Sequence, residues 1–148
     1  MTTLRPAQVI RRVVQAFNEH DLGFLEQQVT EDFERHDLAG AFLRTGSGGV
    51  EVRGFLQALY DGVPDVQLKV LDLIESGDRV VMRYEFSGTH GGEFLGISPT
   101  NRPVNFDGIN IYRFEGDRIS EVWQLWDWAT VLHQMDALTW PPGTADPR

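Results

Sequence analysis

The last long strand of the chain, with the residues that follow it, most constrains the fold. Residues 118–128 read Arg-Ile-Ser-Glu-Val-Trp-Gln-Leu-Trp-Asp-Trp and hold three of the four tryptophans. Glu121, Gln124 and Asp127 are interleaved with these aromatic residues. A carboxylate buried among apolar groups loses hydration, which raises its pKa unless the group is paired, and such a group can carry protons. The same pattern is typical of an amphipathic strand whose polar residues face water while its tryptophans pack in the core.

Length and composition indicate one soluble globular domain. The chain has 148 residues, enough for a sizeable core, and no cysteine, which excludes disulfides, thiolate metal sites and cysteine nucleophiles. The net charge of -9 disfavours binding to nucleic acid or to an anionic membrane. No apolar run is long enough to span a bilayer, and the N-terminus lacks a signal-peptide core. We therefore expect a cytoplasmic protein.

Helical spacing of apolar residues predicts three helices in the first half of the chain, at 6–18, 22–29 and 50–61. Pro6 suits a first helical turn, and Asp21 suits the N-cap of the second helix. Between the second and third helices, residues 30–37 predict the end of a helix that turns into a short strand. Its adjacent residues His36 and Asp37 would point to opposite faces, so only one of them can face a pocket.

Glycine content and period-two patterns organise the rest of the chain. Residues 39–49 hold four glycines and predict a mobile loop that lines or covers a cleft. Alternation predicts an antiparallel meander of strands at 66–75, 79–87, 104–114 and from 118 onward. It places Asn110 with Tyr112 on one face of the third of these strands, and Gln124 with Trp126 on one face of the last. Asn110 and Gln124 are then near neighbours, to within about two residues.

The predicted order, helices first and then the meander, is typical of an α+β fold. We expect a curved antiparallel sheet wrapped around the N-terminal helices, which forms a cone whose open end is a pocket. A short helix follows Asp127, and residues 139–148 form a proline-rich tail. No internal repeat or linker divides the chain, so residues 1–148 are predicted to be one domain.

Several short motifs together resemble the SnoaL-like family of polyketide cyclases, within the nuclear-transport-factor-2-like superfamily. The resemblance covers roughly residues 8–135. The matching stretches are 14–18, Asp32-Phe33 with His36-Asp37, Gly88-Thr89-His90 with 92–97, Pro99-Thr100 with Arg102, 108–114, and Glu121 with Trp123 and Asp127, leading into Leu132 and Gln134.

The resemblance implies a conical α+β barrel, assembled as a homodimer or homotetramer, that uses neither a metal nor a cofactor. Its best-understood members close a ring of an aromatic polyketide by intramolecular aldol condensation, in antibiotic biosynthesis. One carboxylic acid of the final strand acts as acid/base there, helped by a polar residue on the preceding strand. Relatives act in hydroxylation with a reductase, or in pyran or epoxide chemistry.

Site residues carry over position by position. Asp127 matches a family acid at the end of the last strand. Asn110 lies where members carry His or Asp, and Asp107 lies where some carry Glu. His36 and His90 match positions where members also have His. Gln124 departs from the pattern, because the anthracycline cyclases carry their catalytic Asp there and Gln cannot exchange a proton.

The leading hypothesis is therefore a cofactor-independent polyketide cyclase. Asp127 is the expected acid/base, with Asp107 as the alternative acid. His36 is expected either to be the partner of Asp127 or to orient the substrate. The expected substrate-binding residues are Asn110 and Gln124, which would bind carbonyl oxygens, together with His90 and a flat apolar slot of Tyr84, Trp123 and Trp126.

Two other functions stay open, besides a general stress or housekeeping role. One keeps the pocket but changes the reaction to hydroxylation, pyran formation or epoxide opening, the last through Arg83 with Asp107 and Asp127. The other is a non-catalytic protein that binds an aromatic compound, a function that the missing acid at Gln124 would fit.

Overall fold

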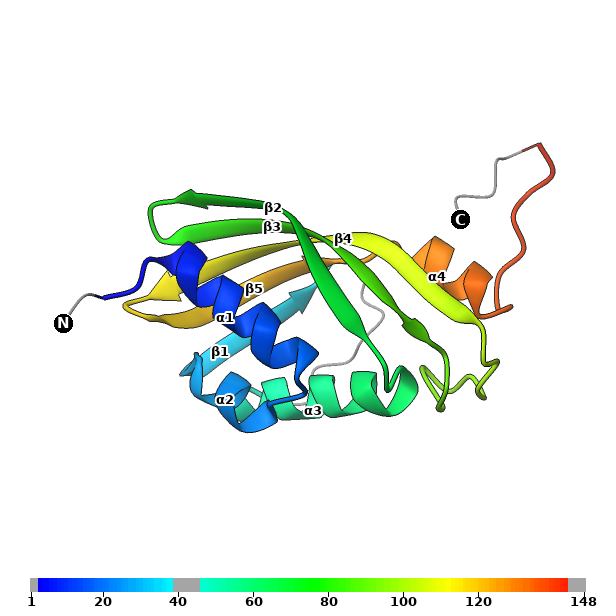
Figure 1. Ribbon diagram of the computed structural model, residues 1–148, viewed down its shortest axis with the longest axis horizontal. Coiled ribbons are helices and arrows are strands. Elements are labelled where there is room, and N and C mark those ends of the chain that lie inside the picture. The colour runs from blue at the N-terminus through cyan, green and yellow to red at the C-terminus, as the bar shows by residue number, and fades with distance from the viewer. Residues whose placement is uncertain (1–2, 39–45, 144–148) are drawn as a thin grey trace.

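A five-stranded curved sheet and four helices make up the computed structural model, which describes residues 3–38 and 46–143 (Figure 1). The α+β prediction is confirmed. In chain order the elements are α1 (Pro6–Asn18), α2 (Leu22–Gln27), β1 (Val29–Asp37), α3 (Gly48–Gly62), β2 (Gln67–Ser76), β3 (Arg79–Thr89), β4 (Pro103–Glu115), β5 (Arg118–Leu125) and α4 (Trp128–Gln134).

The sheet has the strand order β1-β5-β4-β3-β2. Strands β2 to β5 form the predicted antiparallel meander. The first strand differs from the expectation of a wholly antiparallel sheet, because β1 pairs parallel with β5. This pairing follows from the path of the chain. After β1 the chain passes through α3 and the whole meander before β5 lies beside it, so a strand from the first quarter of the sequence borders the last one.

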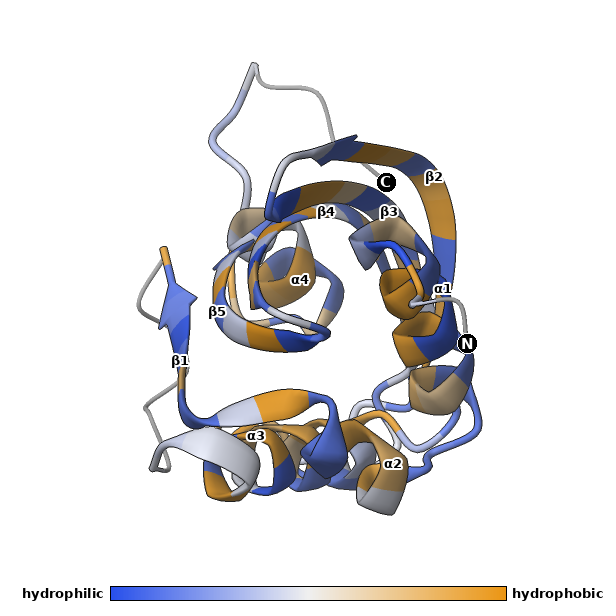
Figure 2. Ribbon diagram, turned by 90° about the vertical axis from the view of Figure 1, so that its left-hand side faces the viewer, coloured by the Kyte–Doolittle hydropathy of each residue, from blue (hydrophilic) through white to orange (hydrophobic). Residues whose placement is uncertain are grey.

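The helices α1, α2 and α3 lie on the concave side of the sheet (Figure 2). Helix α1 presents a buried apolar stripe that includes Val9, Ile10, Val14 and Phe17. The sheet presents alternate residues of each strand to the same interior, and in β3 these are Val80, Met82, Tyr84 and Phe86, as alternation predicts. Within the described residues no helix is long and apolar enough to cross a bilayer.

Predicted element boundaries hold to within a few residues. Asp21 is the N-cap of α2, since its carboxylate accepts a hydrogen bond from the Phe24 amide at 3.1 Å. That helix ends at Gln27 because Val29 already belongs to β1. Helix α3 begins at Gly48, within the predicted loop, and residues 39–45 of that loop lie outside the described ranges, as do residues 144–148 of the tail.

Gly108 allows β3 and β4 to place Tyr84 in the interior. The two residues are paired across the strands, and the Tyr84 ring lies over the Gly108 backbone. A methyl group on Gly108 would meet the phenol ring and hydroxyl of Tyr84 at 2.6 Å, closer than carbon atoms can approach. The missing side chain at this position therefore fixes where the Tyr84 hydroxyl lies.

We expect Gly108→Ala to destabilise the protein by about 1–3 kcal/mol, the usual cost of an overpacked core. Gly49→Ala is the matched control, because the nearest atom to its added methyl group, in Glu26, is 3.5 Å away and alanine favours a helix. Urea unfolding of both variants tests this. Equal stability of Gly108→Ala and wild type would show that Tyr84 moves aside freely.

Candidate active-site cavity

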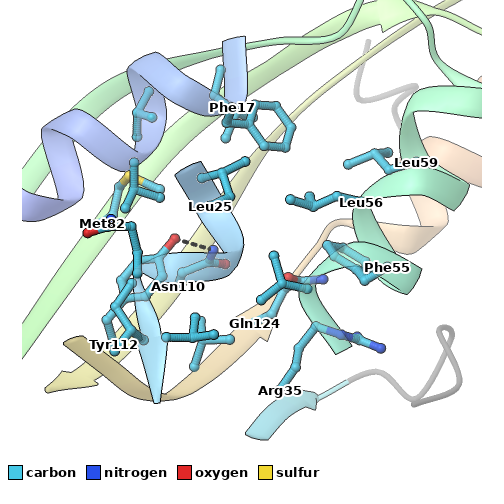
Figure 3. A pocket seen from close by; sticks show the side chains of 18 of the residues that line it. Phe17, Leu25, Arg35, Phe55, Leu56, Leu59, Met82, Asn110, Tyr112 and Gln124 are labelled. Carbon is cyan, nitrogen blue, oxygen red and sulfur yellow. Dashed lines mark hydrogen bonds between the residues drawn. The ribbon is translucent and has the colours of Figure 1, made fainter. Parts of the chain in front are cut away.

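A cavity of about 120 Å³ lies between the concave face of the sheet and the helices α1, α2 and α3 (Figure 3). Most of its wall is aliphatic or aromatic, with Phe17, Leu56 and Met82 among the apolar side chains. Among the described residues that line it there is no Asp, Glu or His. The polar residues of the lining are Gln28, Arg35, Tyr84, Asn110, Tyr112 and Gln124.

Four of the buried interior residues form one hydrogen-bond chain. The Trp126 indole donates to the Tyr84 hydroxyl. The Tyr84 hydroxyl donates to the Asn110 carbonyl oxygen at 3.1 Å, and the Asn110 amide nitrogen donates to the Tyr112 hydroxyl at 2.9 Å. Burial raises the pKa of Tyr84 well above its usual value and that of Tyr112 to about 12. Both phenols are therefore neutral donors at physiological pH.

Gln124 faces the same interior from β5, directly opposite Asn110. This register confirms that the two carboxamides are neighbours. The Gln124 side chain is 4% exposed, and its amide nitrogen has no hydrogen-bond partner within the described part of the chain. A buried donor without a partner costs free energy, on the order of 1–3 kcal/mol. A ligand that accepts this hydrogen bond would recover that cost.

A buried ion cluster ties β1 to α3 at the wall of the cavity. The Arg35 guanidinium contacts the Glu51 carboxylate at 2.8 Å and the Asp37 carboxylate at 3.9 Å, and it lies 4.4 Å from the centre of the Phe55 ring. These three charged side chains are 0–4% exposed. Glu51 sits in the first turn of α3, where the helix dipole stabilises an anion. Arg35 thus holds two buried carboxylates beside the cavity.

Asp37, rather than His36, lies on the concave side of β1. It follows Phe33 and Arg35 at a spacing of two, and those residues line the cavity. Across the strands it is paired with Gln124, and its charge contributes, after burial, to the raised pKa of Tyr84. The sequence left open which member of this His-Asp pair faces the pocket. Alternation with Phe33 and Arg35 is the signal that could have selected Asp37.

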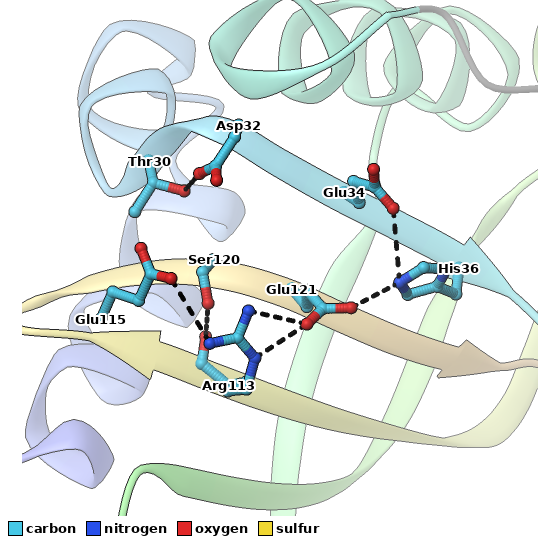
Figure 4. A network of polar contacts seen from close by, with 8 residues as sticks. All are labelled: Thr30, Asp32, Glu34, His36, Arg113, Glu115, Ser120 and Glu121. Carbon is cyan, nitrogen blue, oxygen red and sulfur yellow. Dashed lines mark hydrogen bonds and ion pairs between the residues drawn. The ribbon is translucent and has the colours of Figure 1, made fainter.

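His36 lies on the convex face, in a surface network (Figure 4). Its ring nitrogen Nε2 contacts Glu121 at 2.8 Å, and Glu121 in turn pairs with Arg113 at 2.7 Å. The ring also stacks on Trp123, with 5.3 Å between centroids. Trp123 is therefore outside the cavity, whereas Tyr84 and Trp126 of the predicted slot do line it. The alternation that turns Gln124 inward turns Trp123 outward.

Asp127, the expected acid/base, is an exposed N-cap of α4. Its carboxylate accepts hydrogen bonds from the Thr130 amide at 3.2 Å and from the Thr130 hydroxyl at 2.6 Å. It is not among the cavity residues, because the strand ends at Leu125 and the chain turns into the helix. Asp127 therefore caps the helix and does not line the cavity.

Asp107 and His90 also lie away from the cavity. Asp107 forms an exposed ion pair with Arg83 at 3.4 Å on the convex face, and Asp127 takes no part in it. The ring of His90 is fully buried and bonded to the Thr100 hydroxyl at 3.0 Å and to the Ile97 carbonyl oxygen at 3.2 Å. It organises the segment between β3 and β4. The substrate-binding role predicted for His90 therefore has no support from its position.

The fold and an apolar cavity with a few oriented polar groups define a small-molecule site in a cone-shaped α+β domain. The sequence pattern of the SnoaL-like polyketide cyclases matches residues 7–135, and the chain belongs to this family. No protein among those with curated descriptions matches the chain.

Solved structures agree with this assignment. IdmH of Streptomyces antibioticus, a candidate polyketide cyclase, is 30% identical over 90% of this chain and 99% of its own, with a TM-score of 0.75. TsrD of Streptomyces laurentii is 25% identical over 93% of this chain and 100% of its own, with a TM-score of 0.79. AclR of Streptomyces galilaeus, a candidate hydroxylase, shares the fold. It is 23% identical over 89% of this chain and 96% of its own, with a TM-score of 0.78.

Replacing Arg35 by Met is expected to destabilise the protein by about 3–5 kcal/mol, because Glu51 and Asp37 lose the cation that neutralises them inside the protein. Arg83→Met is the matched control. It removes an exposed guanidinium from two exposed carboxylates, Asp72 and Asp107, and should change stability little. Thermal unfolding compares the two, and similar losses would contradict the importance of the buried cluster.

The network on the convex face predicts a pH dependence. The contacts with His36 and Arg113 lower the pKa of Glu121 from its ordinary value of 4.5. A depressed folded-state pKa stabilises the protein above pH 4.5, and this contribution disappears as the pH falls through the folded-state value. The stability gap between wild type and Glu121→Gln should therefore close on acidification, in unfolding curves measured from pH 7 downward. Replacement of the exposed Glu93 by Gln should give no such gap.

Proposed function

We propose that the protein closes a ring of a polyketide intermediate by cofactor-independent, aldol-type general acid/base catalysis. The observation that carries this proposal is the pair of facing carboxamides, Asn110 and Gln124, in an otherwise apolar cavity. Apolar walls hold a flexible carbon chain in a folded shape, and amide donors bind its carbonyl oxygens. Such confinement can lower the barrier by several kcal/mol, on the order of 7–11 at most.

In the proposed reaction Asp37 is the base. A carbon between two carbonyl groups loses its proton to the Asp37 carboxylate, and the electron pair is delocalised onto a carbonyl oxygen as an enolate. The enolate carbon then bonds to a second carbonyl carbon of the same molecule. The oxygen of that carbonyl takes up the proton from Asp37 and becomes a hydroxyl group. The net reaction is an isomerisation that needs no other reactant.

The position of Asp37 supports this role. The resemblance places the family acid at 124, and here the side chain across the strands from Gln124 is the carboxylate of Asp37. Two neighbours of Asp37 line the cavity. Arg35 lies two residues before it on β1, and Gln124 lies opposite it on β5. The Arg35 guanidinium lies 3.9 Å from the Asp37 carboxylate. Proton transfer of this kind typically contributes about 10²–10⁴-fold.

A second function is binding of an aromatic compound without turnover. The observation that favours it is the lining itself, since no carboxylate or imidazole is among the described residues that form the wall. In that case Asp37 serves only to neutralise Arg35.

The test is to incubate the protein with a panel of aromatic polyketide methyl esters and to follow ring closure by chromatography, with and without NADPH and a reductase. We expect cyclised product without either addition and a loss of about 10²-fold or more in Asp37→Asn. Asp127→Asn is the matched control, because Asn caps a helix as well as Asp does, and it should keep its activity.

Other outcomes separate the alternatives. Turnover that requires the reductase would place the protein with the hydroxylating relatives. Tight binding without product in either condition would favour the binding function. A loss of activity confined to Asp127→Asn would contradict the role of Asp37 and would identify Asp127, at the end of the last strand, as the acid/base.

A further inference from the structure

We infer that Tyr112 and Gln124 together form a binding site for one oxygen atom that carries developing negative charge, such as an enolate or phenolate oxygen. The catalytic role of this oxygen site rests on the proposed function, since the oxygen is the group of the reacting substrate that the cavity would stabilise. As a binding site it can be tested without turnover. The argument depends on the direction of the buried hydrogen-bond chain.

The direction of donation along this hydrogen-bond chain follows from its first member, Trp126. An indole N–H can only donate, so Tyr84 accepts from Trp126. Tyr84 passes its own proton to the carbonyl oxygen of Asn110. With its oxygen occupied, Asn110 donates through its nitrogen to the Tyr112 oxygen. The chain therefore runs one way, from Trp126 to Tyr112.

The last proton of the chain belongs to Tyr112. Its oxygen already accepts from Asn110, and no residue of the described structure accepts its hydrogen. Tyr112 is 8% exposed and lines the cavity, so bulk water is largely excluded from this group. Each donor upstream polarises the next, which strengthens the final O–H as a donor.

Gln124 supplies the second donor. Its amide nitrogen is buried, lines the same cavity and lacks a partner among the described residues. Tyr112 is paired with Val122 and Asn110 with Gln124, so Tyr112 and Gln124 are diagonal neighbours on the concave face. Such neighbours are about 7–8 Å apart at the backbone, within reach of long side chains. Figure 3 shows Asn110 between these two residues at the wall of the cavity.

The chemistry of the two donors restricts the ligand. Both are neutral, and the cation of the lining, Arg35, is engaged by Glu51 and Asp37. A carboxylate or phosphate is bound best by a guanidinium or another cation. Two neutral donors in an apolar wall instead suit a single oxygen whose charge is delocalised into a flat conjugated system. An engineered cavity of about 150 Å³ holds one benzene ring, so a one-ring probe suits this site.

The test uses 4-nitrophenol, whose anion absorbs visible light and whose bound protonation state is read by spectrophotometric titration. Wild type should bind the nitrophenolate form. Tyr112→Phe and Gln124→Leu should each weaken that affinity by about tenfold or more, since each removes a hydrogen bond to a charged oxygen. The pKa of bound nitrophenol should rise in both variants, because they stabilise its anion less.

Tyr60→Phe is the matched control. Its hydroxyl is also buried, but it donates to the Phe17 carbonyl oxygen at 2.8 Å and does not line the cavity. Nitrophenolate affinity should be unchanged there. Tyr84→Phe tests the chain itself. It frees the Asn110 oxygen to accept from Tyr112, so affinity for the anion should fall although Tyr112 is still present.

The inference is overturned if wild type binds no nitrophenolate, or if Tyr112→Phe lowers the affinity no more than Tyr60→Phe does. Equal affinities of Tyr84→Phe and wild type would overturn the directed chain. Failure of the proposed function is separate. A protein that cyclises no polyketide but binds nitrophenolate through Tyr112 keeps the oxygen site and loses the cyclase assignment.

Discussion

The register between β4 and β5 decides which chemistry the cavity contains. With Asn110 opposite Gln124, the concave face receives Gly108, Asn110 and Tyr112 from one strand and Val122 and Gln124 from the other. A shift of β5 by one residue would turn Val122 and Gln124 out and bring Glu121 and Trp123 in. The hairpin turn at Gly116 and the burial of the aromatic residues on both strands oppose that shift. The polar character of the interior is thus a consequence of strand pairing.

Few polar groups line the described cavity, and its cation, Arg35, already pairs with two carboxylates. Arg35 is neutralised by two carboxylates before any ligand arrives, and the phenols of Tyr84 and Tyr112 stay neutral because they are buried. Apart from Arg35, the polar groups of the described lining are neutral side chains, and the donors of Tyr112 and Gln124 have fixed directions. Family membership establishes the SnoaL-like fold and class. The proposed reaction depends on Asp37 taking the place of the acid that the resemblance puts at Gln124.

The sequence predicted the fold well because period-two and helical spacing are local signals. It also turned Asn110, Gln124, Tyr84 and Trp126 inward. The predicted acids were less well placed, for two reasons. Alternation puts Asp107 on the face opposite Asn110 and Trp123 on the face opposite Gln124, whereas the resemblance to other family members favours a site role for both. Asp127 lies just beyond the strand, where alternation no longer applies.

The remaining features depend on contacts that no local pattern encodes. Arg35 meets Glu51 across a loop, and Trp126 reaches Tyr84 because Gly108, on the strand between them, has no side chain. The parallel pairing of β1 with β5 is likewise invisible to periodicity, since the two strands are separated by most of the chain. Such contacts follow from the three-dimensional path, which only the assembled sheet defines.

That parallel pairing also sets the order of events during synthesis. Strand β1 is made before the meander, yet its partner β5 is the last strand of the meander to be made. At about 5–20 residues per second, β1 waits several seconds with its backbone groups unpaired. Its convex side carries Glu34 and His36, charged and polar residues that discourage pairing with another nascent chain. The wall of the cavity that holds Arg35 and Asp37 is therefore completed only after the whole meander has been made.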